Sequence, residues 1–226
     1  MNWIDNLEGL SADTAHCVYS QNGEEGVLEA IFAGIGETNR VLVDIGAGDG
    51  IALSNTRLFI ENGWAGARFD MKNGEGVHRE CITAENVAAL LAGYHVPTDF
   101  DLLSLDIDGV DWWVLRAVLR GGYRPRVMCV EINPGIPADP AVAIEYDPLF
   151  VNRGDDYFGA SLSAFVSLGK RYGYTLVHLP HYNAFFVRSD LVPEGVPPEF
   201  PWQVYDCWPR DPQHRPWHLI TEEDLA

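Results

Sequence analysis

The chain passes from an apolar run into a glycine-rich turn at Val41-Leu42-Val43-Asp44-Ile45-Gly46-Ala47-Gly48-Asp49-Gly50. The shortness and β-branching of the apolar run, residues 41–45, predict a buried strand. Residues 52–62 are predicted to form a helix that ends at Gly63, so the turn joins a strand to a helix. Glycines at such a turn let the backbone approach a ligand closely, and the helix N-terminus behind it favours negative charge. We therefore expect a ligand-binding loop at the carboxyl edge of a sheet.

The spacing of these glycines excludes two common nucleotide sites. A dinucleotide fingerprint needs G-x-G-x-x-G, and Ile51 stands where the third glycine belongs. No Gly-Lys-Ser/Thr is present, so the turn is not a triphosphate-binding loop.

Short apolar runs alternate with stretches of helical period along most of the chain. Further strands are predicted at residues 67–70, 81–82, 102–106, 127–132, 174–177 and 184–187, and further helices at residues 24–35, 84–91, 110–119 and 161–172. Near-continuous apolar strands with helices between them predict a doubly wound α/β domain, Rossmann-like, with a mostly parallel seven-stranded sheet covered on both faces. Only about six residues separate the last two strands, too few for a crossover helix, so we expect an antiparallel pair.

Local signals add three expectations. Asn22 with Glu25 is predicted to cap the first helix, and Thr83 is predicted to cap the helix over residues 84–91. Residues 133–158, rich in Pro, Gly and Asp, are expected to be irregular.

The domain is expected to span residues 1–192. Residues 193–226, rich in Pro and Trp, are expected to pack on the same domain or on a partner subunit through Trp202, Trp208 and Trp217.

Composition and charge restrict the class of partner. The 226 residues carry 15 Lys and Arg against 33 Asp and Glu, a formal net charge of −18. Such a surface repels phosphate backbones and anionic lipids, which argues against nucleic-acid and membrane partners. No apolar run is long enough to span a bilayer, no signal-peptide pattern is present at the start, and the four cysteines lack metal-site spacing. We expect a soluble cytoplasmic protein with a small-molecule partner, and a homodimer is compatible with these features.

Acidic residues follow three of the predicted strands. Asp70 ends the second strand, where an acid can accept both ribose hydroxyls of a nucleoside. Asp106, Asp108 and Asp111 crowd the end of the fourth strand, and Glu131 with Asn133 ends the fifth. Like charges gathered at one sheet edge must be relieved by a raised pKa or by a cation. Both routes stay open; a hard cation such as Mg²⁺ would use Asp106, Asp108 and Glu131.

The pattern D-x-G-x-G-x-G at residues 44–50 resembles the first motif of class I S-adenosylmethionine-dependent methyltransferases. A wider resemblance, over about residues 17–192, is to bacterial FkbM-like methyltransferases. It rests on SQNGEEG (residues 20–26), SNTR (54–57), NGW (62–64), LSLDIDG (103–109), DYFGAS (156–161) and NAFFV (183–187). This chain departs from the family pattern at residues 71–80, where relatives carry a longer segment with a helix.

The resemblance implies S-adenosylmethionine as cofactor and methyl transfer to an oxygen or nitrogen of a small-molecule acceptor. The cofactor-binding residues would be Asp44, Gly46, Ala47, Gly48, Asp70, Thr83 and Asp106, with residues 82–85 at the adenine end. The catalytic candidates are Asp108, the first choice as base, then Glu131 and Asn133. Some relatives hold Mg²⁺ with such acids.

Three different functions stay open beside methyl transfer. Asp106 and Asp108 also match the D-x-D-x-[TV] motif of haloacid-dehalogenase-like phosphatases, in which the first Asp attacks phosphorus and Mg²⁺ is obligatory. That motif usually follows the first strand of its domain, and here it follows the fourth. The second function is that of a cofactor-binding scaffold without transfer activity, and the third is that of a nicotinamide enzyme.

Overall fold

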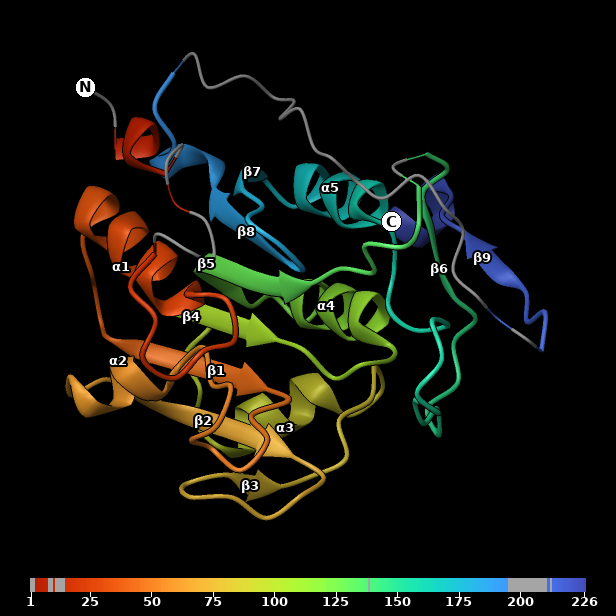
Figure 1. Cartoon of the computed structure of the whole chain (residues 1–226), viewed down its shortest axis with the longest axis horizontal. Coiled ribbons are helices and arrows are strands. Elements are labelled where there is room, and N and C mark those ends of the chain that lie inside the picture. The colour runs from red at the N-terminus through yellow and green to blue at the C-terminus, as the bar shows by residue number, and fades with distance from the viewer. Residues whose placement is uncertain (1–2, 8–9, 11–14, 138, 195–210, 212) are drawn as a thin grey trace.

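The computed structural model describes residues 3–7, 10, 15–137, 139–194, 211 and 213–226. Within them a seven-stranded sheet has the order β3-β2-β1-β4-β5-β8-β7, with helices on both faces (Figure 1). The pairs β1–β2, β1–β4, β2–β3 and β4–β5 are parallel, whereas β8 is antiparallel to both β5 and β7. The structure thus confirms the predicted α/β fold, including the antiparallel pair.

The strands and helices have the following bounds. The sheet contains β1 (Val41–Ile45), β2 (Ala65–Asp70), β3 (His78–Arg79), β4 (Asp99–Leu105), β5 (Arg124–Glu131), β7 (Tyr174–His178) and β8 (Asn183–Arg188). The helices are α1 (Glu24–Ile35), α2 (Arg57–Glu61), α3 (Val87–Gly93), α4 (Asp111–Arg120), α5 (Leu162–Arg171) and α6 (Glu222–Leu225), with short 3-10 turns at Trp3–Asn6 and Ser189–Leu191.

Two apolar cores, one on each face of the sheet, explain why the strands are apolar throughout. Leu42, Leu102 and Phe185 pack with α1 and α2. Their neighbours Val43, Leu103 and Phe186 pack on the opposite face with α3, α4 and α5. Because successive strand residues point to opposite faces, a sheet covered on both sides needs no polar alternation.

The first helix begins as predicted, but its cap differs. Gly23, with φ 79°, occupies the N-cap position, and no side chain caps the helix there. The Glu25 carboxylate instead accepts hydrogen bonds from the backbone N–H groups of Val18, Tyr19 and Ser20. The capping pair was therefore predicted wrongly, because Glu25 is buried beneath the preceding loop and satisfies that loop's backbone.

The helix predicted over residues 52–62 is much shorter, spanning Arg57–Glu61. Leu53 has φ 57°, which breaks helical geometry, and Ser54 Oγ accepts hydrogen bonds from the N–H groups of Thr56 and Arg57. Short polar side chains that bond the nearby backbone compete in this way with helix formation. The segment before α2 is consequently an irregular loop beside the glycine turn.

Two further predictions were wrong in position. The third strand lies at His78–Arg79, not at residues 81–82, and the following helix begins at Val87 after a turn. Asn86, not Thr83, stands at the N-cap position, and Asn86 Oδ1 accepts a hydrogen bond from the Thr83 N–H. The segment over 133–158 is likewise not wholly irregular, because it contains β6 (Val142–Ile144).

The described part of the C-terminal segment pairs with β6. The strand β9 (Trp217–Leu219) runs antiparallel to β6 in a second, two-stranded sheet. The Trp217 ring lies 4.8 Å from the Tyr157 ring between centroids, and the Tyr157 hydroxyl donates to the Pro216 carbonyl at 2.6 Å. Trp202 and Trp208 lie outside the described residues.

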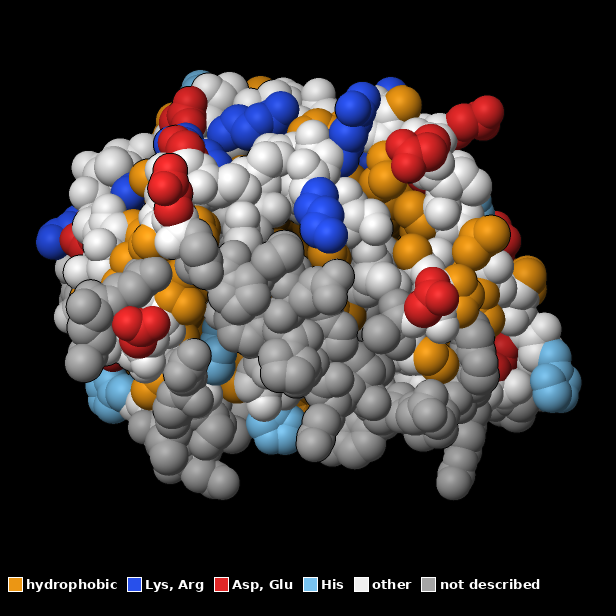
Figure 2. All heavy atoms as spheres, turned by 90° about the horizontal axis from the view of Figure 1, so that it is seen from above, with side chains coloured by type: hydrophobic (Ala, Val, Ile, Leu, Met, Phe, Trp, Pro, Cys, Tyr) orange, Lys and Arg blue, Asp and Glu red, His pale blue; other side chains and the backbone are white. Residues whose placement is uncertain are grey.

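No helix in the described parts of the chain combines the length and apolar character needed to cross a membrane. The face shown in Figure 2 carries both acidic and basic side chains among apolar ones. The net charge of −18 is therefore not spread over this face as a uniform acidic field.

Candidate functional site

A cavity of about 570 Å³ lies where β1, β2, β4 and β5 end. The strand β1 is central to this arrangement because its neighbours β2 and β4 lie on opposite sides of it. Connections that leave a parallel sheet in opposite directions open a crevice beyond the strand ends, the usual ligand site of such folds. The walls are formed by the glycine turn, residues 52–55, the end of β2, residues 80–82, the segment after β4, the last residue of β5, and residues 148 and 150–152.

Two glycines of the turn have different roles. At Gly46, with φ 97°, an added Cβ would lie 1.5 Å from the Asp106 carbonyl oxygen, so only glycine lets the turn pass the end of β4. At Gly48, with φ 58°, an added Cβ would meet no heavy atom within 4 Å. Gly48 and the neighbouring Ala47 line the cavity, so the turn is packed at Gly46 and open toward a ligand at Gly48.

Asp70 connects the glycine turn to the end of β2. Its Oδ2 accepts a hydrogen bond from the Gly48 N–H at 2.9 Å, and its Oδ1 accepts one from the Lys72 N–H at 2.7 Å. Each carboxylate oxygen has a second lone pair, so Asp70 keeps acceptor capacity toward the cavity that it lines. The predicted neighbourhood of Asp70 and the turn is therefore present.

Asp44 lies beneath the turn. Its carboxylate is buried and accepts a hydrogen bond from Thr56 Oγ1 at 2.6 Å. Burial raises the pKa of Asp44 from its ordinary 3.8 to about 6, although the hydrogen bond from Thr56 opposes the shift.

Asp106, Asp108 and Glu131 come together on the opposite wall. One carboxylate oxygen from each lies within 4.8 Å of the others. Burial above all, and then the charge of Asp106, raises the pKa of Glu131. The acids predicted to meet at this sheet edge do meet there.

Asp111 holds the loop that carries Asp108. Its buried carboxylate accepts hydrogen bonds from the N–H groups of Ile107 and Gly109, both at 2.8 Å. Asp108 itself is exposed and has φ 54°, an unfavourable backbone conformation for a residue other than glycine. Such strain persists only where the surroundings impose it, and it is concentrated at functional sites.

Asn133 and Thr83 lie outside the cavity lining. Asn133 Nδ2 donates to the carbonyls of Asp156 and Phe158, and its Oδ1 accepts from the Gly135 N–H. Its amide therefore fixes the loop before α5. Near Thr83, the preceding Cys81 and Ile82 line the cavity instead.

Three amide side chains that were not among the residues predicted from the sequence also line the cavity: Gln21, Asn55 and Asn183. Asn55 Nδ2 donates to Ser104 Oγ at 3.3 Å, and Asn183 stands directly opposite Glu131 in the β5–β8 register. All three belong to segments that carry the FkbM-like resemblance, SQNGEEG, SNTR and NAFFV. Those segments were the signal that could have indicated them.

The cavity is acidic. Its lining includes the carboxyl groups of Asp44, Asp70, Glu80, Asp106, Asp108 and Glu131, whereas Lys72 is the single Lys or Arg among the described lining residues. A wall of this kind attracts cationic molecules and repels phosphates and other anions.

No protein-family model matches the chain, and no curated protein sequence matches it.

Proposed function

We propose that this chain is an S-adenosylmethionine-dependent methyltransferase that acts on an oxygen or nitrogen of a small-molecule acceptor. The observation that carries the proposal is the composition of one cavity. It combines a glycine turn open at Gly48, an acid at the end of β2 beside it, and carboxyl groups on the facing wall. These are the parts needed to bind a nucleoside with an amino-acid tail and to hold an acceptor opposite it.

Charge favours this function over that of a nicotinamide enzyme, and the position of the motif favours it over that of a phosphatase. S-adenosylmethionine carries a sulfonium and an ammonium group against one carboxylate, so it is a net cation that suits an acidic cavity. A nicotinamide enzyme must instead bind the phosphate groups of its cofactor, and Lys72 is the single Lys or Arg among the described lining residues. The phosphatase motif usually follows the first strand of its domain, whereas Asp106 follows β4, and a phosphatase would leave the glycine turn without a role.

In the proposed complex the methionine portion lies along the glycine turn and the ribose hydroxyls bond Asp70. The adenine then lies toward Cys81 and Ile82, which line the cavity beyond β2. The acceptor occupies the side of Asp108 and Glu131. Direct displacement needs the acceptor atom held near the sulfonium methyl while a base removes its proton. Asp108 is the proposed base because it is exposed to the cavity on a constrained loop.

Calorimetric titration tests the binding half of the proposal. We expect S-adenosylmethionine and S-adenosylhomocysteine to bind at one site per chain, and NAD⁺ and ATP to give no heat of binding. Absence of S-adenosylmethionine binding would overturn the proposal. Hydrolysis of p-nitrophenyl phosphate by protein that does not bind S-adenosylmethionine would indicate a phosphatase instead.

Transfer of a tritiated methyl group into a small-molecule extract tests the reaction. Asp108→Asn keeps the shape of the side chain but cannot take up the proton, so we expect transfer to fall about a hundredfold or more. Its affinity for S-adenosylmethionine should equal that of the parent. Transfer at the parent rate would move the base to Glu131, and binding without any transfer by the parent would indicate a scaffold.

A further inference from the structure

Exposed apolar side chains gather at the cavity. The described residues expose seven large apolar side chains: Val18, Ile51, Leu53, Met71, Leu149, Val151 and Leu219. Three of these, Leu53, Met71 and Val151, line the cavity, and Ile51 and Leu149 adjoin lining residues in the sequence. Single exposed apolar residues are ordinary on a protein surface, but a group of them at one cavity marks a surface that contacts an apolar partner.

Leu53 holds its side chain at the cavity against a conformational preference. Its φ of 57° lies in the left-handed region, where glycine and asparagine are usual and a leucine costs energy. The side chain is 67% exposed and lines the cavity. Two residues further on, Asn55 Nδ2 donates to Ser104 Oγ at 3.3 Å, so this loop reaches β4, the strand that leads into Asp108. Strained positions of this kind are concentrated at functional sites, and here the strain presents an apolar side chain to the cavity.

Val151 belongs to a segment that lies beside the loop of the proposed base, Asp108. A Cβ added at Gly109 would lie 2.9 Å from a ring carbon of Phe150, so this ring packs directly on the residue after Asp108. Phe150 and Val151 both line the cavity, and Val151 is 63% exposed. The acceptor side of the cavity therefore has an apolar wall next to the base.

The C-terminal segment holds this wall in place. Arg215 Nη2 donates to Asp155 Oδ2 at 2.6 Å, and the guanidinium carbon of Arg215 lies 4.1 Å from the centre of the Tyr157 ring. The Tyr157 hydroxyl accepts a hydrogen bond from the Glu145 N–H at 3.1 Å, which ties together the two ends of the segment that contains residues 148–152. The apolar side chains of this segment are thus presented from a preorganised surface, which lowers the entropic cost of binding a ligand.

The charge of the cavity selects the polar end of an acceptor that has an apolar body. Among the described lining residues, six carboxyl groups stand against one lysine, which disfavours carboxylate and phosphate acceptors. An ammonium group donates three hydrogen bonds, accepts none, and carries the charge that carboxylates attract. A polyol could form hydrogen bonds with the acids, but it would gain no apolar contact from Leu53 and Val151. An amine attached to an apolar body uses both features.

We infer that the acceptor is an amine on an alkyl or aryl body, with its nitrogen at Asp108 and its body against Leu53, Phe150 and Val151. This substrate class rests on the proposed function. In the reaction the ammonium group gives one proton to Asp108, and the lone pair of the nitrogen then forms a bond to the methyl carbon. The bond between that carbon and sulfur breaks with its electrons left on sulfur, so the products are S-adenosylhomocysteine and an N-methylated ammonium ion.

The probe is hexylamine, titrated by calorimetry into protein saturated with S-adenosylhomocysteine and, separately, into protein without it. We expect one site per chain, and we expect butylamine to bind about tenfold more weakly because it buries two methylene groups fewer. 1-Hexanol has the same body without the charge, so it should bind at least about tenfold more weakly than hexylamine. Hexanoate, the anionic counterpart, should give no heat of binding.

Leu53→Asn and Val151→Asn remove the apolar contacts, and asparagine tolerates the positive φ at position 53. We expect each variant to weaken hexylamine binding about fivefold or more and to keep the parental affinity for S-adenosylhomocysteine. Leu219→Asn is the matched control, because Leu219 is similarly exposed, at 56%, and is not among the described lining residues. Its hexylamine affinity should equal that of the parent, and circular dichroism verifies the fold of each variant.

Equal affinities for hexylamine and 1-hexanol would overturn the assignment of an amine. Parental hexylamine affinity in both Leu53→Asn and Val151→Asn would overturn the apolar wall, and a loss of S-adenosylhomocysteine affinity in Leu53→Asn would assign that leucine to the cofactor instead. Binding of S-adenosylhomocysteine without binding of hexylamine defeats only this inference. Absence of S-adenosylhomocysteine binding defeats the proposed function, and the titration without cofactor then shows whether the cavity still selects apolar amines.

Discussion

Gly48 and Gly63 are two glycines with the same local constraint and different surroundings. Both have positive φ, 58° and 85°, and an added Cβ at either position meets no heavy atom within 4 Å. Gly48 lines the cavity, whereas Gly63 follows α2 and does not. Substitution at either site therefore imposes backbone strain of about 1–2 kcal/mol without a steric clash.

Gly48→Val should lower the affinity for S-adenosylhomocysteine at least about tenfold, or about 1.4 kcal/mol, because the branched side chain fills space assigned to the ligand. Gly63→Val should lose comparable stability in urea unfolding and keep the parental affinity in calorimetry. Equal affinities in the parent and a folded Gly48→Val protein would remove the glycine turn from the binding site.

Asp44 should make stability depend on pH in an unusual direction. An acid whose pKa rises from 3.8 to about 6 on folding binds its proton more tightly in the folded state. Its contribution to the free energy of unfolding is therefore complete below pH 3.8 and is lost as the pH rises through 6. A shift of about two pKa units corresponds to roughly 3 kcal/mol.

Asp44→Asn removes this ionisation and retains an acceptor for Thr56. The free energy of unfolding of the variant minus that of the parent should increase between pH 4 and pH 7, by an amount of the order of 2–3 kcal/mol. Urea unfolding of both proteins at several pH values measures this difference, and parallel curves would show that Asp44 is not destabilised by burial.

At the scale of elements, the strands were predictable because continuous apolar runs in a doubly covered sheet have few other interpretations. The true length of the helix before β2 was not predictable. Ser54 and Leu53 shorten it through local hydrogen bonds and backbone conformation, which the spacing of apolar residues does not reveal. The same distinction holds in the site. The acids at strand ends were found from strand positions, whereas Asn183 became visible only when the antiparallel register placed it beside Glu131.

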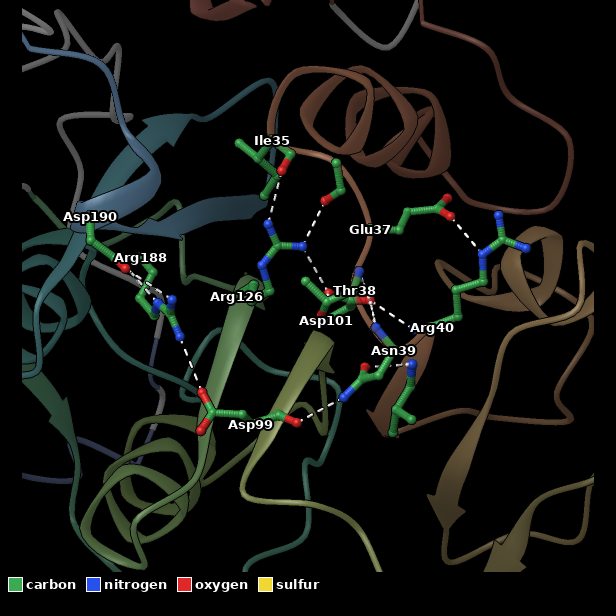
Figure 3. A network of polar contacts seen from close by, with 12 residues as sticks. Ile35, Glu37, Thr38, Asn39, Arg40, Asp99, Asp101, Arg126, Arg188 and Asp190 are labelled. Carbon is green, nitrogen blue, oxygen red and sulfur yellow. Dashed lines mark hydrogen bonds and ion pairs between the residues drawn. The ribbon is translucent and has the colours of Figure 1, made fainter.

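The connection from α1 to β1 is held by a polar network at the opposite end of the sheet from the cavity (Figure 3). The buried Asp101 carboxylate accepts hydrogen bonds from the backbone N–H groups of Thr38, Asn39 and Arg40, and from Arg126 Nη1 at 2.9 Å. Arg126 also donates to the carbonyls of Ile35 and Gly36 at the end of α1. The Asp101–Arg126 ion pair thus holds the end of α1 through Arg126 and the residues before β1 through Asp101.

Asp101→Ala should destabilise the fold by about 3–5 kcal/mol, because it leaves Arg126 buried without its charged partner. Asp99→Asn, which affects an exposed pair with Arg188, should cost no more than about 1 kcal/mol. Urea unfolding compares the two variants. In calorimetry, each of the two variants should bind S-adenosylmethionine with the parental affinity, because the network lies away from the cavity. A large loss of affinity in folded Asp101→Ala would contradict that separation.

At the scale of the whole molecule, the sheet order and the charge distribution act on the same place. The order of β2, β1 and β4 opens the crevice, and its described lining residues include six of the chain's 33 acids and a single lysine. A molecule with net charge −18 adds a long-range attraction for cations to this local field. The cavity should therefore distinguish ligands by charge even when their shapes match.

S-adenosylmethionine and S-adenosylhomocysteine differ by one methyl group and the sulfonium charge, so their comparison isolates this effect. Raising the ionic strength from 0.01 M to 1 M shortens the Debye length from about 30 Å to about 3 Å. We expect S-adenosylmethionine to lose several-fold more affinity than S-adenosylhomocysteine over this range, because it alone carries the sulfonium charge that the acids attract. Calorimetric titrations of both ligands at several salt concentrations measure the ratio of the two dissociation constants. A ratio independent of salt would mean that the acids lining the cavity do not act on the position of the sulfonium, and the placement of the methyl group beside Asp108 and Glu131 would then have to be abandoned.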